Sequence, residues 1–274
     1  MYVDVTIAAR IERAEARMMR DLLASLVGSQ RAPAAFVREL GAGTATYVRP
    51  GSPMNKIIGA GLGEPIDEAA LGDLERCLAY HREPVRVELS TLADPRTYAQ
   101  LAARDYRVIG FENVLACRLA TPTPHSAAAI EVQPVTERLL AQFRETTVEA
   151  AACPDDTGVP VDTFTRDVIG VAVDDSIQAP AARRYLAYRD GAVAGAASMS
   201  IEGDVAVFTG SATLPPHRRH GVQAALLARR LADARAAGAA LAIITTAPGT
   251  QSQANVMKQG FALVYARAVL VRAA

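Results

Sequence analysis

The sequence predicts an α/β protein, an α+β arrangement of helices around a mixed sheet, built as two domains of similar architecture. Three observations support this prediction. The chain has 274 residues, whereas a single domain usually has roughly 100 to 150. Amphipathic helical segments alternate with short apolar segments of strand character. The second half also repeats part of the first at an offset of about 155 residues, as expected for two copies of one unit.

The first half opens with a predicted amphipathic helix over residues 6–27, because apolar residues recur there at steps of three and four: Ile7, Ile11, Ala14, Met18, Leu22 and Leu26. Apolar patterns and turn residues then predict a hairpin over 36–40 and 44–48, a short segment over 56–61, a helix over 67–81, a strand over 84–90, a helix over 95–104 and a strand over 107–119. Residues 121–128, rich in Pro, Thr and Ala, form the predicted linker.

The same order of elements starts again after the linker. The patterns predict a strand near 130–132, helices over 136–151 and 161–174, strands over 184–189, 192–200 and 205–213, a helix over 219–237, a strand over 240–246, a helix over 251–259 and a strand over 261–271. Residues 85–91 align with 241–247, although two strand–helix–strand units could also match by chance. We therefore expect domains at 1–120 and 129–274, joined by 121–128.

Charge and cysteine usage exclude several function classes. The formal net charge is +0, with 15 basic and 15 acidic residues up to residue 122 and 14 of each after it. Neither half should therefore attract nucleic acid or a membrane surface. Cys77, Cys117 and Cys153 lie far apart without histidines at ligand spacing, so we expect no metal site and no disulfide framework. The N-terminus lacks a signal-peptide pattern and no segment is long enough to span a bilayer, which predicts a cytoplasmic protein.

The segment over residues 205–227 carries the strongest chemical signal. An apolar strand leads through Pro215 and Pro216 into an arginine-rich bend with Gly221, followed by a helix. The first amides of a helix lack intrahelical partners and the helix dipole is positive there, so such a bend can bind an anion. Gly221 allows close approach, and Arg218, Arg219 and His220 add positive charge, as a pyrophosphate would require. The alternative is a solvated helix start with no ligand.

This bend resembles the pyrophosphate loop of the GNAT superfamily of acetyl-coenzyme A-dependent acyltransferases, written Arg/Gln-x-x-Gly-x-Gly/Ala. Arg218-Arg-His-Gly221-Val-Gln223 matches its first two anchors and departs at the third, where Gln223 replaces a small residue. Asn255 and Gly260-Phe261 are similar to the closing helix and strand of that family. Residues 129–272 resemble the family well, whereas residues 33–120 resemble it only in their predicted architecture. The chain therefore resembles a tandem GNAT protein with a degenerate first domain.

The resemblance implies acetyl-coenzyme A as co-substrate, without a metal. The residues expected to bind it are Ala212, Thr213, Leu214, Arg218, Arg219, His220, Gly221, Val222, Gln223, Ala224, Ser252 and Asn255. The corresponding bend of the first domain, residues 59–68, has no arginine and carries three carboxylates at its helix start, where they would repel a phosphate. Asp67 is expected to cap that helix. We therefore expect the second domain alone to bind the cofactor.

The catalytic residues are less clearly marked. GNAT enzymes often carry a glutamate on the strand before the bend and a tyrosine four residues before the closing Gly-Phe, but this strand offers Thr209 and Ser211, and Val256 occupies the tyrosine position. Tyr265 is the nearest phenol and the candidate catalytic acid; packing is its alternative role. Four carboxylates in predicted loops ahead of the sheet could select a cationic amine or could simply be solvated: Asp155, Asp156, Asp174 and Asp175.

Two functions remain open at the level of sequence. The first is an N-acetyltransferase that moves an acetyl or short acyl group from coenzyme A directly to an amine of a small molecule or peptide, as a monomer or homodimer. The second is a non-catalytic acyl-coenzyme A-binding module with a regulatory or scaffolding role, since both usual catalytic positions are altered.

Overall fold

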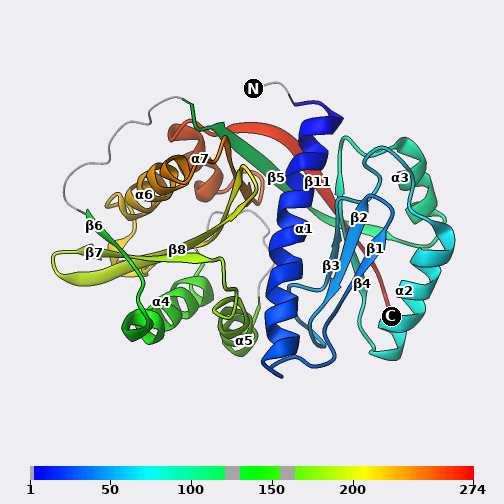
Figure 1. The fold of residues 1–274 in the computed structure, drawn as a ribbon, viewed down its shortest axis with the longest axis horizontal. Coiled ribbons are helices and arrows are strands. Elements are labelled where there is room, and N and C mark those ends of the chain that lie inside the picture. The colour runs from blue at the N-terminus through cyan, green and yellow to red at the C-terminus, as the bar shows by residue number, and fades with distance from the viewer. Residues whose placement is uncertain (1–2, 121–129, 155–163) are drawn as a thin grey trace. The chain divides into compact units, whose positions relative to one another are not determined.

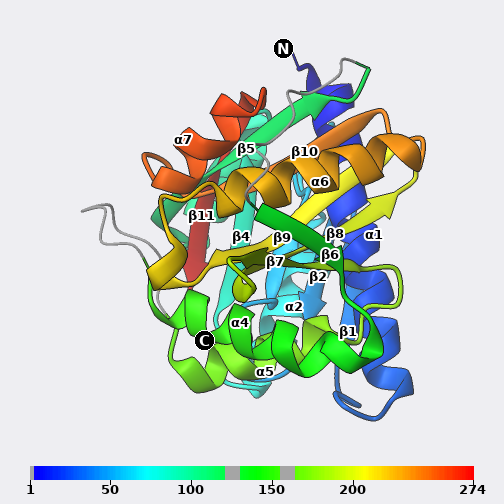
Figure 2. The same ribbon diagram turned by 90° about the vertical axis from the view of Figure 1, so that its left-hand side faces the viewer.

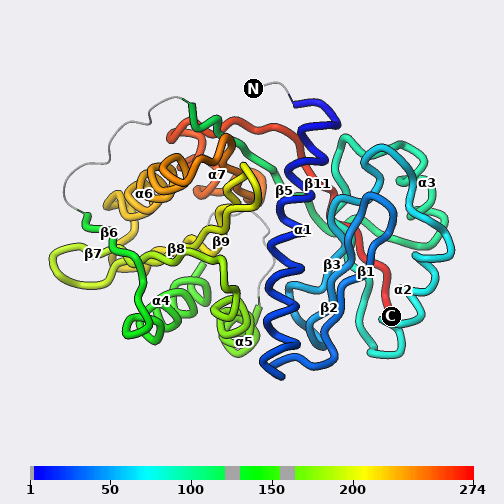
Figure 3. Tube along the Cα trace, in the orientation of Figure 1, coloured from blue at the N-terminus to red at the C-terminus, as the bar shows by residue number. Residues whose placement is uncertain are grey.

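The computed structural model describes residues 3–120, 130–154 and 164–274, so the predicted linker over 121–128 lies outside the described residues. The chain forms two compact units. Unit 1 contains Met1–Val114 together with Val264–Ala274, and unit 2 contains Leu115–Leu263. Figure 3 traces the path of the chain through both units. Within the described residues, no helix combines the length and the apolar character that crossing a bilayer would need.

Unit 1 is built from helices on both faces of its strands. Its elements are α1 (Val5–Gly28), β1 (Phe36–Leu40), β2 (Gly43–Tyr47), β3 (Lys56–Ile58), α2 (Glu68–Tyr80), β4 (Val85–Ser90), α3 (Pro95–Ala102), the first part of β5 (Arg107–Arg118) and most of β11 (Ala262–Arg272). Asp4 starts α1 by accepting a hydrogen bond from the Ile7 amide at 2.9 Å. In Figure 1, α1 lies on one face of these strands, and α2 and α3 lie on the other.

Unit 2 has the same layered construction. Its elements are the end of β5, β6 (Ile130–Pro134), the 3₁₀ helix η1 (Glu137–Leu139), α4 (Leu140–Ala152), α5 (Arg166–Ser176), β7 (Arg183–Arg189), β8 (Ala192–Glu202), β9 (Val205–Thr213), η2 (Pro215–His217), α6 (Val222–Ala236), β10 (Leu241–Thr246) and α7 (Gln251–Lys258). Figure 2 shows α6 on one face of β7, β8 and β9, with α4 and α5 on the opposite side.

The two units share one pattern of strand pairing. In unit 1, β1, β2 and β3 pair antiparallel in sequence order, and β3 then pairs parallel with β4. In unit 2, β7, β8 and β9 pair antiparallel in the same way, and β9 pairs parallel with β10. A parallel pair needs a crossover connection, which α2 supplies in unit 1 and α6 in unit 2. The repeated pattern agrees with the similarity between the two halves of the sequence.

The last strand of the chain packs in unit 1. β11 pairs antiparallel with β4, from Arg267 opposite Ser90 to Arg272 opposite Val85. In unit 2, β5 lies beside β10, and the Leu119 amide donates to the Ala240 carbonyl at 3.0 Å. The boundaries 1–120 and 129–274 remain a prediction, since each compact unit contains a strand segment from the other half of the sequence.

Each unit has its own apolar core. In unit 2, Val222, Leu226, Leu227 and Leu231 place one face of α6 against the strands. In unit 1, the apolar face of α2 packs against β1 to β4 and β11. The side chains that decide these contacts are those whose spacing predicted the helices, because burying one apolar face is what stabilises an amphipathic helix.

Candidate functional site

The candidate site begins where β9 ends and α6 starts. After Thr213 the chain forms the short helix η2 and then a bend over residues 218–221. The sequence predicted a helix from residue 219, but α6 begins at Val222 because Arg219 and Gly221 have φ angles of 63° and 84°. A positive φ is incompatible with a right-handed helix and is uncommon for a residue with a side chain. The arginine-rich segment is therefore a loop leading into the helix.

The first turn of α6 has free main-chain donors. Its first main-chain hydrogen bond runs from the Ala225 amide to the Gly221 carbonyl, at 3.0 Å. Within the described part of the chain, no side chain caps this end of the helix. A Cβ added at Gly221 would meet no atom within 4 Å, so the space outside the bend is open. Free amides, a helix dipole and open space together can bind an anion such as pyrophosphate.

The three basic residues of the bend have different environments. The half-buried Arg218 donates from Nε to the Thr213 carbonyl at 3.3 Å and from Nη2 to the Cys153 carbonyl. His220 shares a 2.6 Å contact between Nδ1 and the Arg218 carbonyl, which favours a proton on Nδ1. Arg219 is exposed on the bend. Arg218 therefore holds the loop in shape, while Arg219 supplies charge beside the free amides.

Gln223 stands where the family pattern has a small residue, but it leaves the bend unobstructed because its side chain contacts α7. Asn255 Nδ2 donates to Gln223 Oε1 at 2.5 Å, and Gln223 Nε2 donates to Ser252 Oγ at 3.4 Å. Gln251 Nε2 in turn donates to Asn255 Oδ1 at 2.8 Å. The structure thus brings Gln223, Ser252 and Asn255 together between α6 and α7, next to the bend.

The remaining predicted binding residues lie at the two ends of the bend. Ala212 and Thr213 are the last residues of β9, opposite Ala196 and Gly195 of β8, and the Leu214 amide donates to the Ala194 carbonyl at 3.0 Å. Gly195 is required here, because a Cβ at this position would lie 2.7 Å from the Ala212 carbonyl oxygen and 2.8 Å from Val222 Cγ1. Val222 is buried and Ala224 is half-buried on α6.

The pairing of β9 with β10 ends before the chain reaches the bend. The parallel register of β9 and β10 runs from Val205 opposite Leu241 to Phe208 opposite Ile244. β9 then continues to Thr213 and β10 to Thr246. The carboxyl ends of β9 and β10 are thus the side of unit 2 from which the bend emerges, which is where ligands of open α/β sheets usually bind.

The corresponding bend of unit 1 is filled by protein. A Cβ at Gly61 would lie 2.7 Å from Thr97 Oγ1, and the Gly61 carbonyl accepts a 2.7 Å hydrogen bond from the Asp94 amide. Asp67 caps α2 by accepting from the Ala70 amide at 2.7 Å, as the sequence predicted. The glycines of this loop therefore permit close packing against α3, and a carboxylate already binds the helix start.

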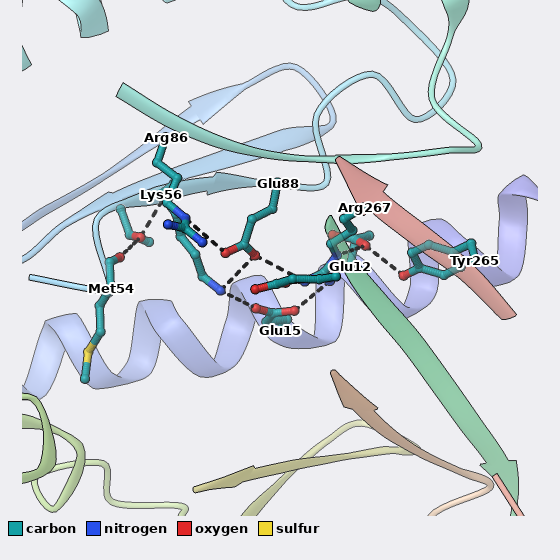
Figure 4. A network of polar contacts seen from close by, with 10 residues as sticks. Glu12, Glu15, Met54, Lys56, Arg86, Glu88, Tyr265 and Arg267 are labelled. Atoms are coloured by element: carbon teal, nitrogen blue, oxygen red, sulfur yellow. Dashed lines mark hydrogen bonds and ion pairs between the residues drawn. The ribbon is translucent and has the colours of Figure 1, made fainter. Parts of the chain in front are cut away.

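Tyr265 lies in a buried network of charged residues in unit 1 (Figure 4). Its hydroxyl donates to Glu12 Oε1 at 2.7 Å, and Arg267 Nε donates to the same oxygen at 2.8 Å. Arg267 also donates to Glu15 at 2.7 Å and to Glu88 at 3.2 Å. Burial, followed by the charge of Glu12, raises the pKa of Tyr265 well above its usual value. The hydroxyl therefore keeps its proton and already has an acceptor, which argues for a structural role.

The network holds more carboxylates than cations. Lys56 Nζ donates to Glu15 Oε1 at 2.7 Å and to Glu88 Oε2 at 2.9 Å, and Glu112 lies 3.8 Å from Arg267. Burial raises the pKa of Glu12, and burial followed by repulsion from Glu88 raises the pKa of Glu112 to about 6. Burial acts on Glu15 in the same direction, but the charges of Arg267 and Lys56 outweigh it and lower its pKa.

Other candidates from the sequence are accounted for by neighbours or lie outside the described residues. Asp174 accepts a bidentate pair of hydrogen bonds from Arg144, at 2.5 and 3.0 Å, and Asp175 is fully buried. Asp155 and Asp156, in the same predicted group of carboxylates, lie outside the described residues. Val256, which occupies the usual tyrosine position, is fully buried in the core on α7.

Sequence reasoning missed two residues of this region. Arg230 is fully buried on α6, and Gly210 has a φ of 57° in the middle of β9. Both were visible as irregularities: Arg230 falls on the apolar face defined by Val222 and Leu226, and a glycine interrupts an apolar strand.

Comparison with known proteins agrees with this geometry. Residues 152–261 match the family described as Acetyltransferase (GNAT) family. No curated protein matches the sequence. A solved GCN5-related N-acetyltransferase from Kribbella flavida is 20% identical with a TM-score of 0.68, covering 97% of this chain and 95% of its own. A tandem GNAT protein from the clavulanic acid biosynthesis pathway, solved without AcCoA, is 14% identical with a TM-score of 0.62, covering 99% and 97%.

A third structure, a GCN5-related N-acetyltransferase from Sphaerobacter thermophilus, is 15% identical with a TM-score of 0.55, covering 75% of this chain and 65% of its own. The fold is thus that of the GNAT acetyltransferases in a tandem arrangement. The segment with the family's sequence pattern contains the whole bend and both helices that flank it. The particular reaction is a separate question, because one fold can carry many chemistries.

Proposed function

We propose that the protein is an N-acetyltransferase that moves an acetyl or short acyl group from coenzyme A directly to an amine of a small molecule or peptide. One observation carries the proposal. The first turn of α6 presents free amides beside Arg219 and an unobstructed Gly221, within the segment that matches the GNAT family. GNAT enzymes generally use acetyl-coenzyme A, and a pyrophosphate fits a helix N-terminus of this kind.

Different residues would bind the cofactor and hold the loop that binds it. The amides of the first turn and Arg219 would hold the pyrophosphate, while Arg218 keeps the loop in shape through its bonds to the Thr213 and Cys153 carbonyls. Gln223 and Asn255 connect α6 to α7 on the neighbouring side. Acetyl-coenzyme A supplies the activated acyl group as a thioester. The acceptor amine must be neutral to attack it, so its proton must pass to water or to a base.

The non-catalytic alternative also rests on a specific observation. β9 offers Thr209 and Ser211 where GNAT enzymes often carry a glutamate, Val256 is buried at the usual tyrosine position, and the Tyr265 hydroxyl is bonded to Glu12. A module that binds acyl-coenzyme A without transferring the acyl group would show this pattern. Thioester cleavage, measured with and without a library of amines, separates the two functions: amine-dependent release of free thiol supports transfer, and binding without release supports the module.

Calorimetry tests the proposed site directly. Acetyl-coenzyme A should bind once per chain, and Gly221→Glu should abolish binding because it places bulk and negative charge where the pyrophosphate must lie. The matched control is Gly238→Glu at the other end of α6, where φ is 82° and a Cβ would also meet no atom within 4 Å. Both variants should lose similar stability from the strained backbone, about 1 kcal/mol each.

Three results would overturn this assignment. Two equivalent sites per chain would mean that unit 1 also binds the cofactor, and no binding at all would remove the cofactor from the proposal. Unchanged affinity in Gly221→Glu would show that the bend is not the pyrophosphate site. Monomer or homodimer, and a cytoplasmic location, remain predictions from the sequence.

A further inference from the structure

Arg230 is a fully buried arginine on α6 with no role in the chemistry described above. Its Nε donates to the Leu226 carbonyl at 3.2 Å, and its Nη1 donates to the Ser198 carbonyl at 3.1 Å and to the Thr209 carbonyl at 3.4 Å. The guanidinium carbon lies 4.6 Å from the centre of the Phe208 ring. Arg230 therefore connects α6 to two adjacent strands, β8 and β9, at a single point.

Stability alone does not explain this residue. The polar partners of Arg230 in the described structure are carbonyl oxygens, and its buried Nη2 has no hydrogen-bond partner there. Burial disfavours its charged form and lowers its pKa to about 9. A buried cation balanced by neutral dipoles costs free energy that an apolar side chain of similar volume would avoid. We therefore expect the guanidinium to stabilise a local backbone conformation that an apolar side chain could not stabilise.

The backbone conformation next to Arg230 is a bulge in β9. Ala196 lies opposite Ala212, but Ser198 lies opposite Thr209, so β9 contains one more residue than β8 between these pairs. Gly210, with its φ of 57°, lies within the extra segment. A bulge disrupts the local ladder and bends the strand that carries it. Arg230 binds the carbonyls of Ser198 and Thr209, the last pair before the bulge.

The bulge coincides with the end of pairing between β9 and β10. The last pair in the parallel register is Phe208 with Ile244, and the bulge follows Phe208 within two residues. The Phe208 ring is the one that stacks against Arg230. The Arg230 side chain thus contacts both Phe208, the last residue of β9 that pairs with β10, and the carbonyl of the next residue, Thr209. Arg230 comes nine positions after Gly221, the N-cap of α6, which corresponds to about 13 Å along the helix axis.

We propose that Arg230 is a positioning residue that fixes the β9 bulge and so sets the separation of β9 and β10 beyond Phe208. This inference rests on the proposed function in one respect: the opening that we infer between these strands, where their pairing ends, would receive the acyl-bearing arm of coenzyme A, and the pyrophosphate would bind at the start of the same helix. One rigid helix then sets both ends of the binding site, the bend through Gly221 and the opening through Arg230.

The test uses Arg230→Met, Arg230→Lys and the control Arg229→Met in the full chain. Arg229 is the neighbouring arginine on α6; it pairs with Asp233 and donates to the Val132 carbonyl at 2.8 Å, so its loss removes similar bonds from a different strand. Calorimetry measures affinity for acetyl-coenzyme A and for 3′-phosphoadenosine diphosphate, a probe with the pyrophosphate but without the acyl-bearing arm. Hydrogen exchange of residues 205–214, without ligand, reports directly on the bulge.

We expect Arg230→Met to weaken acetyl-coenzyme A binding at least tenfold and to change binding of the nucleotide probe less than threefold. Exchange over residues 209–213 should speed up at least tenfold, while exchange in β7 stays within threefold; a general loss of stability would accelerate both. Arg230→Lys should be intermediate, since it keeps the charge but loses the planar fork that reaches both strands. Arg229→Met should stay within threefold in every measurement.

Unchanged exchange in β9 together with unchanged acetyl-coenzyme A affinity in Arg230→Met would overturn the proposal. If Arg230→Met does not fold, Gly210→Ala perturbs the bulge within β9 itself. A Cβ at this position would lie 3.0 Å from Ser198 Oγ, and the φ angle of Gly210 is positive. Gly210→Ala should reproduce the loss of affinity and the faster exchange, and normal behaviour would count against the proposal. If the wild type binds no acetyl-coenzyme A, the proposed function fails, and β9 exchange alone decides the role of Arg230.

Discussion

Replacing Tyr265 by phenylalanine separates a catalytic tyrosine from a structural one. The change removes one hydroxyl, which donates to Glu12 Oε1 at 2.7 Å inside the charged network of unit 1. Tyr265 is 5% exposed, and the change keeps its ring, so its packing is otherwise unchanged. Glu12 retains the hydrogen bond from Arg267 Nε at 2.8 Å.

The magnitude follows from the type of bond that is lost. A hydrogen bond to a charged group contributes about 1.5 to 3 kcal/mol. In a chain of this length each kcal/mol corresponds to roughly 2 to 4 °C in Tm, so Tm should fall by roughly 3 to 12 °C. The rate of acyl transfer should fall less than about tenfold, because a tyrosine whose pKa is raised and whose proton is already donated to Glu12 is a poor acid.

The assay compares Tyr265→Phe with Tyr106→Phe, both in unit 1. Tyr106 is likewise buried and donates to a carboxylate, Glu75 Oε1, at 3.1 Å. Steady-state rates and thermal melts are measured for both variants, at one pH and saturating acetyl-coenzyme A. A similar loss of stability with nearly wild-type rates in both supports the structural role. A rate loss of roughly 10²- to 10⁴-fold confined to Tyr265→Phe, at unchanged cofactor affinity, would refute this reasoning and make Tyr265 a working acid.

Three further predictions concern charge. Arg267→Met removes the cation that pairs with Glu12 and that shares Glu15 and Glu88 with Lys56. It should cost about 3 to 5 kcal/mol at pH 7, and less at pH 4.5, where carboxylates take up protons; an equal loss in denaturant titrations at both pH values contradicts this. Glu112 binds its proton more tightly in the folded protein, where its pKa is about 6, than at its ordinary pKa of 4.5. As pH rises from 4.5 to above 6, the wild type should therefore lose up to about 2 kcal/mol of unfolding free energy relative to Glu112→Gln. A difference in unfolding free energy between the two proteins that stays constant from pH 4 to 8 argues against this. Without an enzymic base, the transfer rate should climb with pH toward the pKa of the acceptor amine, and a plateau near neutrality would instead indicate a tuned group on the protein.

Local patterns in the sequence determined the elements and the bend. The spacing of Ile7, Ile11, Met18 and Leu22 predicted a helix over 6–27, and the structure has α1 at Val5–Gly28. Asp67 was predicted to cap a helix and does so. The bend over Arg218 to Gly221 was found from residue types within one short segment. These features depend on interactions over a few residues, which is why one sequence is enough to predict them.

Tertiary structure decided which of these residues share a site. Tyr265 and Glu12 are 253 residues apart in the sequence, and Arg267 and Glu12 are 255 apart, yet each pair is in hydrogen-bond contact. Such contacts arise because the last strand of the chain pairs with β4 in unit 1, and no local pattern specifies that pairing. The role of Arg230 likewise depends on two strands meeting one helix face. Burial then gives these long-range contacts their energetic weight, because charged groups removed from water must find partners within the protein.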